Sequence, residues 1–274
     1  MLRRTPAHFV LRAAEKQTFA NIMNQQSASI HLLLLAMLAC VALPAWGQLR
    51  ILTSPAIEPA LVPIVAAYRA ETHSEVVLLT GGTSSVRKSG DVAGTADVLV
   101  VPAGQLGMAS KKKALADEGA RELGRVRLGI FVREGVTPPS VATPDALRAA
   151  LLAASAIAYD NASTGRQFGT AVNAMGIAAE LEIKTTRLDD VEGVLEHVRK
   201  GKSNGLGVAP VTAIIPNAAK GLKLVGPLPP EVNEGVRYSV AVLKNSKSTA
   251  AAQAFVKYLL SPATKARLAA LGVE

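Results

Sequence analysis

Short apolar runs alternate with longer segments of helical periodicity along most of the chain. The first apolar runs occupy residues 49–53, 76–79 and 96–101. Each is too short for a helix and is rich in valine, leucine and isoleucine, which is typical of buried strands. Between the first two runs, apolar side chains recur at helical spacing, at Leu61, Val62, Val65 and Tyr68. This alternation predicts an α/β fold with mostly parallel sheets.

Two longer stretches, residues 125–134 and 236–244, alternate polar and apolar residues and bracket a middle section of about a hundred residues. Each predicts a strand, and the pair favours two connections between two lobes. We therefore expect two Rossmann-like lobes joined by two hinge strands. The first lobe is predicted to comprise residues 48–129 and 240–274, and the second lobe residues 130–239.

The stretch after the second apolar run has the features of an anion cradle. Gly81 and Gly82 permit a tight turn, and Thr83, Ser84 or Ser85 can cap a helix that begins there. The first amides of a helix are unpaired and carry a partial positive charge, so they can hold an anion. Helix capping alone explains the same residues equally well. A nucleotide phosphate loop is disfavoured, because the G-x-x-x-x-G-K-[ST] pattern is missing.

Three other stretches resemble this one. Each is a loop between a predicted strand and a predicted helix, and each offers polar side chains or the unpaired amides of a helix start. They are residues 54–56, 161–165 and 189–191, the last at the end of a loop expected over 185–191. Open α/β sheets bind ligands at the carboxyl ends of their strands. We therefore expect the four stretches to converge on a cleft between the lobes.

The N-terminal region has the pattern of a targeting segment. Residues 30–44 contain a short apolar run, and small residues precede a possible cleavage site after Gly47. Residues 1–47 are therefore predicted to be a signal peptide that directs the protein to the periplasm, with translation beginning at Met1 or Met23. An uncleaved anchor helix is the alternative interpretation.

The amino-acid composition limits the kinds of ligand and reaction that the protein can support. Cleavage after Gly47 removes Cys40, the only cysteine, and lowers the formal net charge from +9 to +6. A modest positive charge suits anions, whereas scattered basic residues and 4% aromatic residues argue against nucleic-acid binding. The remaining histidines, His73 and His197, fall in predicted helices, and no nucleophile elbow or zinc motif is present. We expect no cofactor, no metal and no enzymatic activity.

In its predicted strands and in the loops that follow them, the chain resembles the periplasmic molybdate-binding proteins of ABC importers. These proteins have the type II periplasmic binding protein fold. The resemblance runs over nearly the whole predicted mature chain, including A-D-V-L-V at residues 96–100 and G-L-G-V at residues 205–208. It implies a monomer that delivers a small anion, a molybdate-like oxyanion above all, to a membrane permease.

The resemblance also implies ligand-binding residues. The family's first serine falls on Ala56, with Ser54 two residues away, and its second hydroxyl falls on Thr83, beside Ser84 and Ser85. Amide donors fall on Thr164 and Val191, and the family's tyrosine falls near Pro210. The loops add further candidates, which are Arg87, Asn161, Ser163 and Arg166.

Arginine near the loops also fits a small organic carboxylate, because guanidinium pairs with such groups through two hydrogen bonds. A sensing role and a secreted serine hydrolase using Ser54, Ser84 or Ser163 are the remaining alternatives.

Overall fold

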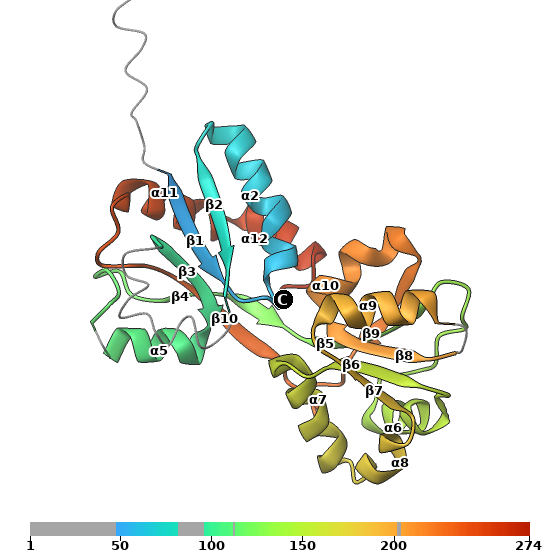
Figure 1. Ribbon diagram of the computed structural model, residues 1–274. Coiled ribbons are helices and arrows are strands. Elements are labelled where there is room, and N and C mark those ends of the chain that lie inside the picture. Colours follow the sequence, from blue (N-terminus) through green and yellow to red (C-terminus); the bar gives the residue numbers. More distant parts are fainter. Residues whose placement is uncertain (1–47, 82–95, 112, 202–203) are drawn as a thin grey trace, which may run out of the picture. The chain divides into compact units, whose positions relative to one another are not determined.

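The computed structural model describes residues 48–81, 96–111, 113–201 and 204–274, and within these residues ten strands form two sheets of five (Figure 1). The first sheet has the order β2-β1-β3-β10-β4 and the second the order β7-β6-β8-β5-β9. The first sheet's strands are β1 (Leu49–Thr53), β2 (Val76–Thr80), β3 (Val98–Pro102), β4 (Arg121–Val126) and β10 (Val236–Val242). The second sheet's strands are β5 (Leu128–Arg133), β6 (Ile157–Asp160), β7 (Thr185–Leu188), β8 (Leu206–Pro210) and β9 (Leu222–Pro227).

The two sheets share one topology. In each, the first three strands in order are parallel, and the fourth strand is antiparallel to both of its neighbours. Parallel strands bring their carboxyl ends to one edge of the sheet, where the following loops and helix starts gather. The predicted α/β class is therefore confirmed, but the sheets are mixed, because β10 and β5 each run antiparallel to both of their neighbours.

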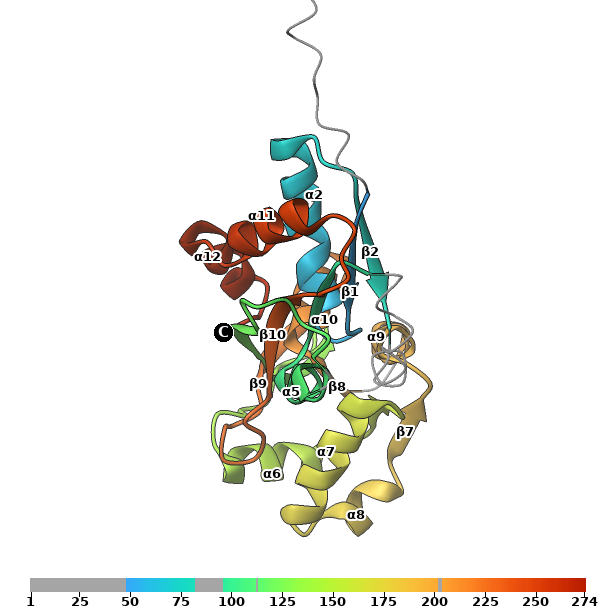
Figure 2. The ribbon, with the colours of Figure 1, turned by 90° about the vertical axis from the view of Figure 1, so that its left-hand side faces the viewer.

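Helices cover both faces of each sheet, as Figures 1 and 2 show. One face of the first sheet packs against α2 (Glu58–Thr72), α11 (Thr249–Leu259) and α12 (Pro262–Ala270), and the other against α5 (Ala103–Lys111). One face of the second sheet packs against α6 (Pro144–Ala153), α7 (Ser163–Ala174) and α8 (Ala178–Glu182). Its other face packs against α9 (Val191–Lys200) and α10 (Val211–Ile214), which continues into η1 (Ile215–Lys220).

The first connection between the sheets differs from the prediction. The single strand expected over residues 125–134 is wrong, because β4 ends at Val126 and β5 begins at Leu128. Arg127 alone separates them, and the chain changes sheets at this residue. The alternating pattern continues through the change because it reports which faces are buried, not which strands are hydrogen-bonded neighbours.

Two other local predictions are wrong. Residues 185–188, expected to be part of a loop, form β7, an edge strand without a fully buried side chain, so it lacks the apolar run that marks a strand. The stretch G-P-L-P-P at residues 226–230, whose three prolines predict a stiff connector, begins inside β9, the opposite edge strand of the same sheet. Proline is tolerated there because an edge strand leaves some N–H groups unpaired.

The sequence T-P-D at residues 143–145 predicts a helix start, with Thr143 as the cap and Pro144 at the first helical position, and the structure confirms it. Thr143 is the N-cap of α6, and its hydroxyl accepts a hydrogen bond from the Ala146 N–H. Among the described residues, no helix is both long and apolar enough to span a membrane.

Candidate functional site

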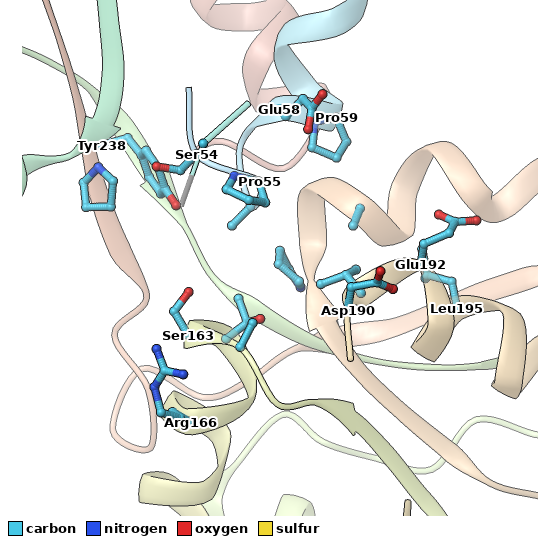
Figure 3. A pocket seen from close by; sticks show the side chains of 18 of the residues that line it. Ser54, Pro55, Glu58, Pro59, Ser163, Arg166, Asp190, Glu192, Leu195 and Tyr238 are labelled. Atoms are coloured by element: carbon cyan, nitrogen blue, oxygen red, sulfur yellow. The ribbon is translucent and has the colours of Figure 1, made fainter. Parts of the chain in front are cut away.

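A pocket of about 550 Å³ lies where loops from both sheets meet (Figure 3). Seven of the residues predicted from the sequence line it, namely Ser54, Ala56, Ser163, Thr164, Arg166, Val191 and Pro210. Asn161 is not among the lining residues. Thr83, Ser84, Ser85 and Arg87 lie outside the described residues, so their roles remain predictions.

The loop after β1 forms one wall. The carbonyl oxygen of Ser54 accepts hydrogen bonds from the N–H groups of Ile57 and Glu58, which turns the chain into α2. Ser54 itself is 8% exposed and lines the pocket, and its hydroxyl has no partner among the described residues. The carbonyl oxygen of Ala56 accepts a hydrogen bond from the hydroxyl of Thr212 on α10, which ties this loop to the second sheet's helices.

Asp160, which is 1% exposed, holds the start of α7 in place through hydrogen bonds. Its carboxylate accepts hydrogen bonds from the Ala162 N–H at 2.6 Å, the Gly165 N–H at 3.3 Å and the Thr164 hydroxyl. The amides of Ser163 and Thr164 are left without an acceptor among the described residues. These are the free amides of a helix start that suit an anion.

The start of α9 has the same form. Asp190 is its N-cap, and its carboxylate accepts a hydrogen bond from the Gly193 N–H at 2.8 Å. From the sequence, Asp189 and Asp190 are both predicted to be able to cap this helix, and the structure shows that Asp190 is the cap. The amides of Val191 and Glu192 have no acceptor among the described residues, so a second pair of donors borders the pocket.

The charged side chains divide the pocket into two regions. In Figure 3, Arg166 lies beside Ser163, while Asp190 and Glu192 lie on another side. Glu58 adds a third carboxylate to the lining. A negative ligand is therefore expected near the start of α7, because the carboxylates repel it from the start of α9.

Sequence reasoning missed several polar residues that line the pocket, and two of them carry unpaired polar atoms. Tyr238 on β10 is 3% exposed, its hydroxyl has no partner among the described residues, and burial raises its pKa to about 12. Gln105 on α5 has a buried Oε1 atom that has no hydrogen-bond partner among the described residues. Tyr238 lies in a strand of alternating polar and apolar residues and Gln105 in a helix of ordinary composition, so no local signal identified them.

Tyr238 should make the protein lose stability at high pH. An exposed tyrosine ionises near pH 10, whereas folded Tyr238 keeps its proton to a pH of about 12. Between these values the unfolded chain binds fewer protons, so the free energy of unfolding falls, by up to about 3 kcal/mol. Urea unfolding followed by circular dichroism from pH 9 to 12 measures this fall. Tyr238→Phe should show a smaller one, and parallel profiles would contradict the assignment.

The described residues offer little support for a metal site or for a serine hydrolase. No group of three or more histidine, cysteine, aspartate or glutamate side chains in them could hold a metal ion. His73 is the C-cap of α2 and His197 lies in α9, and neither lines the pocket. Ser54 and Ser163 therefore have no histidine base beside them in the pocket.

Comparison with known proteins gives one curated relative and many similar structures. An aconitate isomerase from a Pseudomonas species is 24% identical over 166 residues, which cover 61% of this chain and 62% of that protein, less than two thirds of its length. The substrate-binding domain of a putative molybdenum ABC transporter from Clostridium difficile superimposes with a TM-score of 0.66 at 19% identity, covering 83% of this chain and 98% of that one.

The periplasmic molybdate-binding protein of Azotobacter vinelandii superimposes with a TM-score of 0.65 at 16% identity, covering 83% of this chain and 99% of that one. Together with the two sheets, these likenesses confirm the predicted two-lobed type II periplasmic binding protein fold. The family model for bacterial extracellular solute-binding proteins matches residues 49–274. The chain therefore belongs to the family of bacterial extracellular solute-binding proteins.

Proposed function

We propose that the protein is the periplasmic substrate-binding component of an ABC importer and captures a small anion in the cleft between its two lobes. The observation that carries this proposal is the pocket bordered by the start of α7, where the Ser163 and Thr164 amides have no acceptor among the described residues. The amides of a helix start can hold an anion without a counter-charge, because aligned peptide dipoles stabilise it. Delivery to a membrane permease, and action as a monomer, remain predictions from the family resemblance.

Within the pocket, the anion is placed beside the start of α7. The amides of Ser163 and Thr164, the Ser163 hydroxyl and the Arg166 guanidinium border this region. Ser54 adds a hydroxyl from the loop after β1. Donors from both lobes would then close on one ligand, as a solute-binding protein requires.

A molybdate-like oxyanion and a small organic carboxylate both fit these donors. The two solved molybdate and molybdenum proteins support the oxyanion by likeness of fold. Ala56 and Pro210 weaken it, because neither supplies a side-chain donor and proline also lacks an N–H. A buried oxyanion whose hydrogen bonds are unfilled is costly.

Anion binding should raise the melting temperature of the purified protein. The panel consists of molybdate, tungstate, sulfate, phosphate, acetate, malate and aconitate at equal ionic strength. A ligand at a hundred times its dissociation constant stabilises the fold by about 2.7 kcal/mol, which for a chain of this size is a rise of roughly 5–10 °C.

Arg166→Ala should reduce the rise, because the variant removes the cation beside the start of α7. Arg148→Ala, on the exposed face of α6 and outside the pocket, is the matched control and should keep it. The absence of a shift with every anion would count against the proposal.

A second candidate is the isomerisation of aconitate, which the name of the curated relative suggests. Glu58, Asp190 and Glu192 place carboxylates in the pocket that could move a proton. Incubating the purified protein with aconitate and separating the isomers by chromatography tests it. Turnover abolished by Glu58→Gln or Glu192→Gln would replace the binding role with an enzymatic one.

A further inference from the structure

A second cavity, of about 210 Å³, adjoins the pocket. The two share lining residues, among them Gln105, Thr164 and Tyr238. The second cavity extends to the connections between the sheets, where Arg127, Leu128 and Val236 line it. The space open to a ligand therefore continues from the start of α7 to Arg127.

Unsatisfied polar atoms gather around this second cavity. Among the described residues, three buried side-chain nitrogen or oxygen atoms lack a hydrogen-bond partner, namely Gln105 Oε1, Arg127 Nε and Arg133 Nε. The first two belong to residues that line the cavity, and Arg133 does not line it. A buried polar group without a partner costs about 1–3 kcal/mol, so native proteins keep few of them. Both atoms are closed to solvent, so a ligand in the cavity meets them only when their side chains turn toward it.

Tyr238 adds a third unpaired group. Its side chain is almost fully buried, it lines both cavities, and its hydroxyl has no partner among the described residues. Because burial raises its pKa to about 12, the hydroxyl keeps its proton at neutral pH and can donate a hydrogen bond.

Arg127 supplies positive charge at the far end. One of its terminal nitrogens, Nη2, lies 2.6 Å from Oε1 of Glu274, while Nε remains unpaired. Guanidinium and phenol donors together match the two oxygens of a carboxylate.

We infer that the second cavity binds a carboxylate of an organic acid whose other carboxylate lies at the start of α7. The ligand is then a small di- or tricarboxylate, held at one end by the Ser163 and Thr164 amides and at the other by Arg127 and Tyr238. A compact oxyanion fills one end only and leaves the buried groups at the other end unpaired. This inference rests on the proposed function and specifies its ligand.

Calorimetric titration of the full protein tests the inference, with malate, citrate, acetate and molybdate as probes. Wild type should bind malate or citrate at least about tenfold more tightly than acetate or molybdate, because a second charged group adds hydrogen bonds. Arg127→Gln and Tyr238→Phe should each weaken the tighter of malate and citrate by about 10- to 100-fold. Both variants should change acetate binding by less than about twofold, because acetate occupies the α7 end alone.

Two control variants separate binding from folding. Arg125→Gln removes a neighbouring arginine that pairs with Glu234 and lines neither cavity, so it should leave all affinities unchanged. Glu274→Gln breaks the ion pair of Arg127 but keeps the guanidinium, so binding of the polycarboxylate should persist or strengthen.

The outcomes distinguish the two proposals. If acetate or molybdate binds as tightly as malate and citrate, or if Arg127→Gln and Tyr238→Phe bind the polycarboxylate as wild type does, the inference is wrong while the anion-binding function stands. If none of the four probes binds, and the melting scan also shows no shift, both are wrong.

Discussion

Replacing Gly165 with alanine should destabilise the protein by more than about 4 kcal/mol, which is exceptional for one methyl group. Gly165 is the third residue of α7, directly above the end of β6. An added Cβ would overlap the carbonyl oxygen of Asp160 and lie 2.7 Å from its carbonyl carbon. Both atoms belong to the backbone, so no side-chain rotation relieves the clash and the start of α7 must move.

The same change four residues later is the matched control. A Cβ at Gly169, also in α7, meets nothing within 4 Å. Gly169→Ala should therefore stabilise the helix by about 0.5–1 kcal/mol. Urea unfolding followed by circular dichroism measures both variants. Similar unfolding midpoints for the two would contradict the close approach of α7 to β6.

Gly165→Ala should also abolish any rise in melting temperature caused by an anion. The clash displaces the helix start whose Ser163 and Thr164 amides are proposed to hold the ligand. Gly169→Ala leaves that start in place and should keep the rise.

Replacing Asp160 with alanine should cost about 3–5 kcal/mol of stability, because the carboxylate that satisfies several donors is removed. The Ala162 and Gly165 amides and the Thr164 hydroxyl all donate to Asp160, which is buried. Without it, these donors are left in an interior where water reaches them poorly. The substitution should also lower anion affinity, since the same carboxylate orients the first turn of α7.

Asp190→Ala is the control for Asp160→Ala. Asp190 also caps a helix at the pocket. Among the described residues its carboxylate accepts one hydrogen bond, from the Gly193 amide, and this bond is exposed to solvent. Loss of such a cap costs about 1 kcal/mol. Comparison of the two free energies of unfolding checks the difference, and equal losses would show that burial of Asp160 contributes nothing.

Most strands and helices were predictable because their signals are local. The strand over residues 49–53 and the cap at Thr143 agree with the structure, since apolar periodicity and capping chemistry involve residues a few positions apart. The split at Arg127 was not predictable in this way. Which sheet a strand joins depends on partners such as Gly129 with Ala209, eighty residues away.

The residues of the candidate site also fall into those with a local sequence signal and those without one. Ser54, Thr164 and Val191 were predicted because each lies in a stretch between a predicted strand and a predicted helix, where the family resemblance also implies ligand-binding residues, and all three line the pocket. Tyr238 and Gln105 were missed, because one lies within a strand and the other in a helix of ordinary composition.

The sequence by itself determined the α/β class, the helix starts that present free amides, and the family resemblance. These depend on periodicity, capping and short motifs, all of which are properties of neighbouring residues. Only the tertiary structure decided that Tyr238, Gln105 and Arg127 border the same space as those helix starts. Strand pairing brings Tyr238 beside Pro102 across 136 positions of sequence. The burial that leaves polar atoms of these residues without partners in the described parts of the chain exists only once the sheets and helices have packed.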